Sequence, residues 1–340
     1  MIQSLLDAIL TRIQMSLTLT VESLDGLVAS WDKWHHSLKW GSIFVIPAWL
    51  KVWWESFGRS AELYLRTLRE GDRIIGLAPL QINQGTASFI GSADVCDYLD
   101  LAVAPGKERE LCNLLLDDLK EKGVNKLDLR PLRPDSVVLT ELAGMARDRG
   151  HEVLCQPEDI SVELDLPATW DEYLSTLNEK QRHEVRRKLR RLSQADNVEH
   201  TCVEAGPEVD GYLDVFLRLF SLSKGKKASF MTPARESFFR SLAGATAGIG
   251  LLRLGLLNID NAPAAMTMGF DYEGSHYLYN SAYDPRFSRL SVGLLCKVLC
   301  LKDSIERGRK TWDFLKGGEP YKYQLGGRQV PISGCQITIS

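Results

Sequence analysis

Two hydrophobic patterns alternate along the chain. Apolar residues at helical spacing predict a helix over 110–123 and a long helix over 169–194. Short apolar runs separated by turn residues predict strands within 61–92 and a three-strand meander over 249–285. The same patterns predict helices at 140–150, 211–224, 234–247 and 291–308, a helix after Pro47, and strands at 126–132, 159–167 and 311–315. We therefore expect an α/β (α+β) protein whose sheets are mixed but mainly antiparallel and are flanked by helices.

The order of these elements occurs twice. Each half runs helix, antiparallel hairpins, helix, strand, and the helix before each final strand ends at a glycine, Gly123 or Gly308. An aspartate lies inside each of these apolar strands, and Asp128 and Asp313 are separated by the same 185 residues as the two glycines. Self-similarity at a fixed offset indicates two copies of one domain. The expected domains are 1–156 and 157–340, joined near Cys155–Ile160.

The composition is that of an ordinary globular protein and does not indicate a particular ligand. The 340 residues are 44% hydrophobic and 25% charged, which is enough for two ordinary cores. A formal net charge of -3 gives no global attraction to nucleic acid, so DNA is not an expected partner and any anion site must be local. Seven dispersed cysteines, with no CxxC and no Cys/His cluster at zinc spacing, predict reduced thiols, a cytoplasmic location and no metal site.

The first fifteen residues lack the basic leader of a signal peptide and carry Asp7 in their middle. Their apolar residues share one helical face, which predicts a helix that docks on the protein itself or on a second subunit, giving a homodimer. A membrane surface is less favoured because the polar face has few basic residues. No stretch of the sequence reaches the ~18 apolar residues of a membrane span.

The second half resembles the GNAT acyltransferase fold in its element order. In that fold two strands splay apart, and the pyrophosphate of acyl-CoA binds the N-terminus of the following helix, where free N–H groups and the helix dipole favour an anion. The matching stretch here is "DPRFSRLSVGLLC". The resemblance implies acyl-CoA (acetyl-CoA) as co-substrate, bound by Arg286, Arg289, Ser291, Val292, Gly293 and Leu294.

A narrower resemblance covers nearly the whole chain. "SAYDPRFSRLSVGLL", followed by "GRKTWDFLKGGEPYK", looks like the signature of the CelD/BcsL-type acetyltransferases, with Val292 where that family usually has proline. "TWDEYLSTLNEKQRHEVRRKLRRL" and "SIFVIPAWLKVWWESFG" resemble other segments of the same family. That family is similar in turn to the Fem peptidyltransferases, which implies two tandem GNAT-like domains. Only the second copy here keeps the polar tail "KGGEPYK".

Acylation of an amine sets two chemical requirements. A base must take a proton from the acceptor, and an acid must protonate the departing thiolate. Glu319 and Asp284 are the candidate bases, and Tyr321, Tyr283 and Tyr279 are the candidate acids. Surface loop polarity explains the carboxylates equally well, and core packing explains the tyrosines.

Charged residues nearby are candidates for substrate binding. Asp313 is costly to bury alone, so a lysine partner is expected, either in a structural ion pair or in the active site. Seven Lys and Arg residues between Lys180 and Arg191 form a solvated helix face or an anion site for CoA phosphates, an acidic acceptor or tRNA. The substrate-binding candidates are Lys316, Lys322, Asp313, Tyr283, Arg182 and Arg186.

Three functions fit these features. The favoured one is N- or O-acyl transfer from acyl-CoA to a small molecule or to an envelope or polysaccharide precursor. Fem-like transfer from aminoacyl-tRNA is the second; tRNA is the less favoured partner because no long heptad segment suggests the helical arm that Fem enzymes often insert. The third is a non-catalytic scaffold in polysaccharide synthesis.

Overall fold

The computed structural model describes residues 17–222 and 230–340, which belong to two compact units. Unit 1 contains the chain up to Glu158 together with 333–340, and unit 2 contains 159–332. The helix expected in the first fifteen residues lies outside the described residues. No helix in the described part of the chain is long and apolar enough to cross a membrane.

The boundary between the units falls inside two strands, β7 (Glu152–Asp165) and β13 (Arg328–Thr338). The division between Glu158 and Asp159 lies within the segment Cys155–Ile160, where the junction was expected, and the chain there is continuous strand. Its polar sequence suits the exposed stretch of a strand. The final strand returns residues 333–340 to unit 1.

Unit 1 is built on a mainly antiparallel sheet with the strand order β1-β2-β3-β4-β6-β13-β7, and β5 pairs with β3. The pairing of β4 with β6 is parallel. The strands confined to this unit are β1 (Leu17–Val21), β2 (Glu62–Glu70), β3 (Arg73–Asn83), β4 (Thr86–Phe89), β5 (Ala102–Val103) and β6 (Lys126–Leu132). The helices are α2 (Leu24–Ala29), α3 (Trp31–Trp34), α4 (Pro47–Phe57), α5 (Glu108–Glu121) and α6 (Ala143–Asp148), which follows a π-helical turn at Val138–Leu142, with 3₁₀ turns at His35–Ser37, Ile43–Val45 and Gly58–Ser60.

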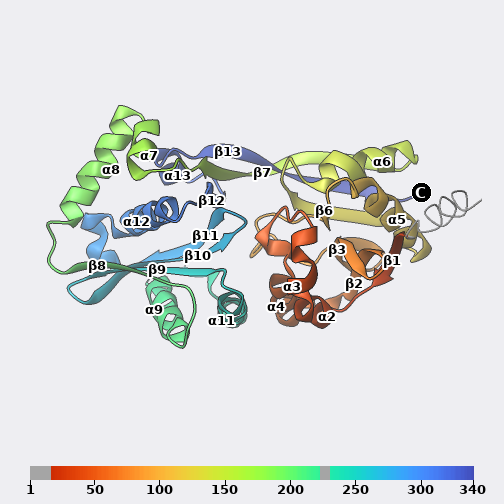
Figure 1. Cartoon of the computed structure of the whole chain (residues 1–340), viewed down its shortest axis with the longest axis horizontal. Coiled ribbons are helices and arrows are strands. Elements are labelled where there is room, and N and C mark those ends of the chain that lie inside the picture. The colour runs from red at the N-terminus through yellow and green to blue at the C-terminus, as the bar shows by residue number, and fades with distance from the viewer. Residues whose placement is uncertain (1–16, 223–229) are drawn as a thin grey trace, which may run out of the picture. The chain divides into compact units, whose positions relative to one another are not determined.

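Unit 2 has the strand order β13-β7-β12-β11-β10-β9-β8. Figure 1 shows α7, α8 and α12 on one face of this sheet and α9 and α11 on the other. The strands are β8 (Val198–Val203), β9 (Leu252–Ile259), β10 (Ala262–Tyr272), β11 (Ser275–Tyr283) and β12 (Thr311–Lys316). The helices are α7 (Trp170–Thr176), α8 (Glu179–Leu192), α9 (Val209–Ser221), α11 (Pro233–Gly248), α12 (Val292–Glu306) and α13 (Pro320–Gln324), with a 3₁₀ turn at Pro285–Leu290. A hydrophobic core that includes Leu295, Leu301 and Trp312 fills the space under α12, and α7 and α8 extend it.

The two aspartates of the sequence repeat occupy equivalent positions. Strand β6 pairs parallel with β4 and antiparallel with β13, and β12 pairs parallel with β11 and antiparallel with β7. Each parallel ladder contains three residue pairs, and the aspartate closes the third: Ser88 with Asp128, and Tyr277 with Asp313. This equivalence confirms that the two units repeat one arrangement of strands.

Two helix predictions need correction. The helix expected over 169–194 is two helices, because Leu177 adopts an extended conformation and Asn178 starts α8 with a capping box, its side chain accepting from the Gln181 N–H. The tail after Gly318 contains the short helix α13, entered through Pro320. Strands β1, β8 and β13 were not predicted, since none combines a strong apolar alternation with turn residues at both ends.

The expectation of seven reduced thiols is also wrong. Cys155 on β7 and Cys335 on β13 form a disulfide within unit 1. They are 180 residues apart in sequence and meet because their strands are neighbours, which no local spacing reveals. The other five cysteines are free.

Candidate active site

The strands β11 and β12 separate inside the sheet of unit 2. Their shared ladder ends at Tyr277 and Asp313. Directly beyond, β11 places two residues, Leu278 and Tyr279, opposite Gly269 of β10, and β12 gains a residue against β7. Bulges bend strands and redirect their side chains. The next backbone groups of β11 and β12 therefore no longer pair with each other, and the sheet opens here.

Asp313 helps to shape this opening. Leu315, two residues further along β12, has φ 62°, a left-handed conformation that leucine rarely adopts. Its N–H donates to the Asp313 carboxylate at 2.7 Å, and the Ser161 hydroxyl lies 3.4 Å from the same oxygen. The buried carboxylate is thus hydrogen-bonded to the turn that it precedes.

Lys322 binds the carbonyl group of Leu315. Its Nζ donates to the carbonyls of Leu315, Lys316 and Gly317 at 2.9, 2.7 and 2.9 Å, and lies 2.9 Å from Glu319. An ammonium has three N–H groups. Because four acceptors surround them and the side chain is buried, Lys322 has no donor left for a substrate. Its position favours a structural role, and Lys316 enters this network through its backbone carbonyl.

The N-terminus of α12 lies beyond the end of β11. Ser291 precedes it with φ 56°, and the Ser291 carbonyl accepts from the N–H groups of Leu294 and Leu295. The N–H groups of Val292 and Gly293 are the first-turn donors available to a ligand. The Tyr283 ring faces Gly293 so closely that a Cβ at Gly293 would lie 3.0 Å from it. Val292 is fully buried, so only its backbone can face a ligand. Leu294 also packs against the core.

A cation that the sequence did not single out also reaches this helix end. Lys188 of α8 places Nζ 2.8 Å from the Ser291 hydroxyl and 3.3 Å from Glu184. Lys188 lies three residues after Val185 and four before Leu192, on the same helical face as these buried residues. A lysine within an apolar stripe was the signal that could have identified it.

Asp284 is a poor candidate for the base. It is buried and accepts from the Arg286 backbone N–H, Nε and Nη2 at 2.9, 2.8 and 2.6 Å. The Arg286 guanidinium holds the pKa of Asp284 below its usual range, and the carboxylate therefore has low proton affinity. The guanidinium of Arg286 is itself largely exposed, as is the side chain of Arg289.

Tyr279 and Tyr321 lie in different surroundings. The Tyr279 ring packs 5.3 Å from Phe239 of α11 and 5.4 Å from Phe270. Tyr321 packs against the core under α12, and the Lys297 ammonium lies 4.9 Å from its ring centroid and 2.9 Å from the Gly293 carbonyl. Burial, assisted by the Glu319 carboxylate, raises the pKa of Tyr321, so its phenol stays protonated at neutral pH.

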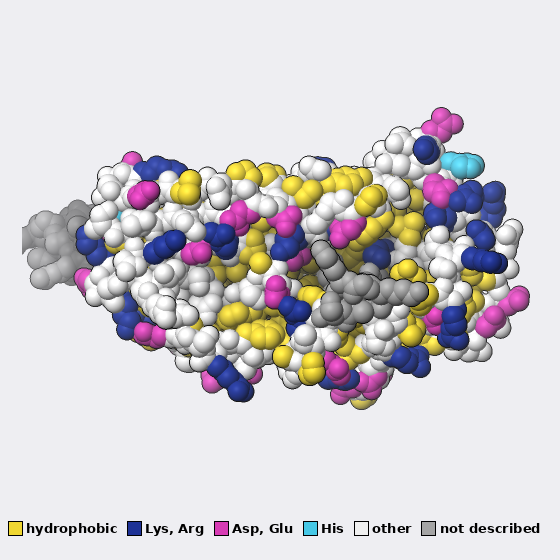
Figure 2. Space-filling model, turned by 180° about the vertical axis from the view of Figure 1, so that it is seen from behind, with side chains coloured by type: hydrophobic (Ala, Val, Ile, Leu, Met, Phe, Trp, Pro, Cys, Tyr) yellow, Lys and Arg dark blue, Asp and Glu magenta, His cyan; other side chains and the backbone are white. Residues whose placement is uncertain are grey.

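Arg182 and Arg186 lie on α8. They line a shallow hollow together with Asn178, His183 and other residues of that helix. Figure 2 shows Lys and Arg side chains gathered at the end of unit 2 that carries α8. This surface suits a phosphate-rich ligand, but the hollow is not enclosed by any other element.

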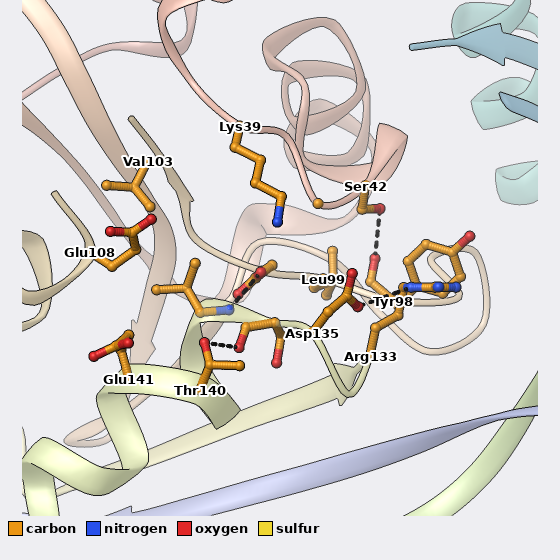
Figure 3. A pocket seen from close by; sticks show the side chains of 14 residues that line it. Lys39, Ser42, Tyr98, Leu99, Val103, Glu108, Arg133, Asp135, Thr140 and Glu141 are labelled. Carbon is orange, nitrogen blue, oxygen red and sulfur yellow. Dashed lines mark hydrogen bonds and ion pairs between the residues drawn. The ribbon is translucent and has the colours of Figure 1, made fainter. Parts of the chain in front are cut away.

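A separate cavity lies in unit 1, between the loop at Lys39–Ser42 and the start of the π-helical turn (Figure 3). Asp100 lies in its wall and accepts from the N–H groups of Val137 and Val138 at 2.9 and 3.4 Å. Burial raises the pKa of Asp100 to about 7. None of the site residues expected from the sequence lines this cavity.

Comparison with known proteins agrees with the geometry of unit 2. Residues 179–323 match the family model described as "Acetyltransferase (GNAT) domain". Unit 2 has the GNAT fold. The match includes the splayed strands, the start of α12 and the tail through Tyr323. A search of curated proteins gave no match.

Solved structures resemble the whole chain at low sequence identity. FemX aligns with a TM-score of 0.64 and 13% identity over 94% of this chain and 96% of its own. A conserved protein of unknown function from Bacteroides thetaiotaomicron aligns with 0.57 and 12% over 95% and 100%. The C-terminal domain of a putative lysylphosphatidylglycerol synthetase from Agrobacterium fabrum aligns with 0.54 and 11% over 83% and 86%. These likenesses show the fold alone.

Proposed function

We propose that unit 2 transfers an acyl group from acyl-CoA to an amine or hydroxyl of a small molecule or glycan precursor. The observation that supports this most is the opening between β11 and β12 beside the N-terminus of α12. An anion binds well at a helix N-terminus, where N–H groups and the dipole act together. Lys188 adds a positive charge next to Ser291.

The chemistry follows from the groups around the opening. The acceptor attacks the thioester carbonyl carbon, and backbone N–H groups freed at the bulges stabilise the oxyanion. Glu319, half exposed, takes the acceptor's proton directly or through water. The C–S bond then breaks, and the neutral phenol of Tyr321 protonates the thiolate. Asp313 and Lys322 act through β12, whose shape they maintain.

Transfer from aminoacyl-tRNA is the second candidate, and the basic outer face of α8 is the observation that favours it. A donor assay separates the two. With acetyl-CoA and a panel of amines, we expect free thiol to be released. Release of amino acid from aminoacyl-tRNA, without any reaction of acetyl-CoA, would reverse the assignment. Inactivity with both donors would favour a non-catalytic scaffold.

Lys188 provides the matched variant for this assay. Lys188→Ala removes a cation from the proposed phosphate site, so we expect KM for acetyl-CoA to rise about tenfold, roughly 1.4 kcal/mol, with a smaller change in kcat. Arg187→Ala is the control, because Arg187 pairs with Glu184 on the same helix and is half exposed. Equal effects of the two variants would contradict the proposed site.

A further inference from the structure

Three soft ligand groups, with a fourth thiol beside them, lie between the edge strand β8 and helix α12. His200 and Cys202 are two residues apart on β8, so they share one face of the strand. Cys296 and Cys300 are four residues apart on α12 and share one helical face. Cys300 Sγ lies 3.4 Å from His200 Nε2, and the ligand atoms of His200, Cys296 and Cys300 all lie within 4.8 Å of one another. Cys202 lies outside this group of three, but its thiol is close enough to that of Cys300 to raise the pKa of Cys202.

The sheet leaves space for this cluster at Gly255. This glycine is buried in β9, where a side chain would normally pack. A Cβ at Gly255 would lie 2.4 Å from Cys300 Sγ and 3.6 Å from His200 Nε2. Any side chain there would therefore enter the space of the cluster. Thr267 also contacts it, with Oγ1 3.2 Å from Cys300 Sγ, where its hydroxyl can donate to a thiolate.

We propose that His200, Cys202, Cys296 and Cys300 bind one zinc ion. Tetrahedral Zn²⁺ with Zn–S near 2.3 Å and Zn–N near 2.0–2.1 Å places neighbouring sulfur and nitrogen ligands about 3.6 Å apart. The distance from Cys300 to His200 fits this edge. Each thiol loses its proton on binding, and Cys296 exchanges its weak contacts with the Gly255 and Ala265 carbonyls for the metal.

Four protein ligands make a closed, structural site. It joins β8, the edge strand of unit 2, to α12, the helix whose N-terminus forms the proposed acyl-donor site. The site therefore goes beyond the proposed function and does not depend on it. Sequence spacing alone misses it because the two ligand pairs lie on elements more than ninety residues apart.

Metal content and cobalt substitution test the site in the full chain under reducing conditions. After loading with zinc and dialysis, we expect one zinc per chain. Replacement by Co²⁺ should give the visible bands of a tetrahedral ion together with a thiolate charge-transfer band. Absence of stoichiometric metal, a cobalt spectrum without thiolate character, or a Cys202–Cys300 disulfide in the untreated protein would each overturn the proposal.

Variants locate the ion. Cys300→Ser removes a ligand and Gly255→Ala fills the space, so each should weaken zinc at least tenfold in competition with a chromophoric chelator. Cys112→Ser is the control, because Cys112 is a buried free thiol of unit 1. A zinc ion that survives Cys300→Ser and Gly255→Ala with unchanged affinity would also overturn the proposal. If a variant fails to fold, the zinc content and the cobalt spectrum of the wild-type protein test the proposal.

Discussion

At the scale of single residues, buried charges control the geometry of the opening in unit 2. Asp313 binds the N–H of Leu315 and Lys322 binds its carbonyl, so the left-handed residue is hydrogen-bonded at both ends. Asp313 and Lys322, one of the two lysines expected as its partner, are thus joined through the backbone of Leu315. A charged group buried in this way stabilises the fold through its hydrogen bonds. If one partner is removed, the remaining polar groups stay buried without a hydrogen bond, which is unfavourable.

Lys322→Met tests this role. The substitution leaves three carbonyls without the donor that they share, at a cost of about 1–3 kcal/mol for each group that stays unsatisfied. We expect the free energy of unfolding, measured by urea denaturation, to fall by at least about 2 kcal/mol. Lys310→Met is the control, since Lys310 is exposed. A stable Lys322→Met protein would show that Lys322 does not hold β12.

Asp100 in unit 1 gives a prediction about pH. Its pKa is raised to about 7 by burial, so the folded state keeps a proton that the unfolded state has already lost. Stability should therefore fall as pH rises from about 4 to about 7, by up to about 1.4 kcal/mol per pKa unit. Asp100→Asn removes this loss and keeps an acceptor for Val137.

Thermal melts of wild type and Asp100→Asn between pH 5 and 8 check the sign. The variant should gain stability relative to wild type as pH rises. Asp72→Asn is the control, because Asp72 is an exposed aspartate of the same unit and does not line this cavity. A difference that does not change with pH would contradict the raised pKa of Asp100.

At the scale of elements, a helix-capping motif divides a segment whose apolar periodicity is continuous. The apolar pattern of 169–194 predicted one helix, but the reciprocal hydrogen bonds of Asn178 and Gln181 start a new helix after Leu177. The signal was present as Asn178 followed three residues later by glutamine. The meander, α12 and β12 were predicted correctly because each has strong periodicity and clear end signals.

Asn178→Ala should therefore weaken α8. Loss of an N-cap side chain costs about 0.5–2 kcal/mol, and we expect a destabilisation of about 1 kcal/mol in urea denaturation. Gln194→Ala, an exposed position after the helix, is the control. If the two variants have the same stability, the capping box contributes little.

At the scale of the whole molecule, the sequence repeat predicted the tandem of units and the equivalence of Asp128 and Asp313. It could not predict that β13 returns to unit 1, because strand pairing across the chain depends on contacts that leave no local pattern. The position of Lys188 within an apolar stripe was a local signal, but its partner Ser291, 103 residues away, could not be predicted from the sequence. The family resemblance predicted that the N-terminus of α12 belongs to the site. The residues that pack around this helix end could be identified only from the structure.

The central claim is that acyl-CoA binds at the N-terminus of α12 in unit 2, and calorimetric titration with acetyl-CoA tests it most directly. We predict one site per chain in wild type and no measurable binding in Gly293→Glu, which adds a carboxylate to the first turn of α12, where the pyrophosphate is proposed to bind. Gly244→Glu, on open surface of α11, should bind as wild type does. Unchanged affinity in Gly293→Glu, or no binding of acetyl-CoA by wild type, would contradict the account.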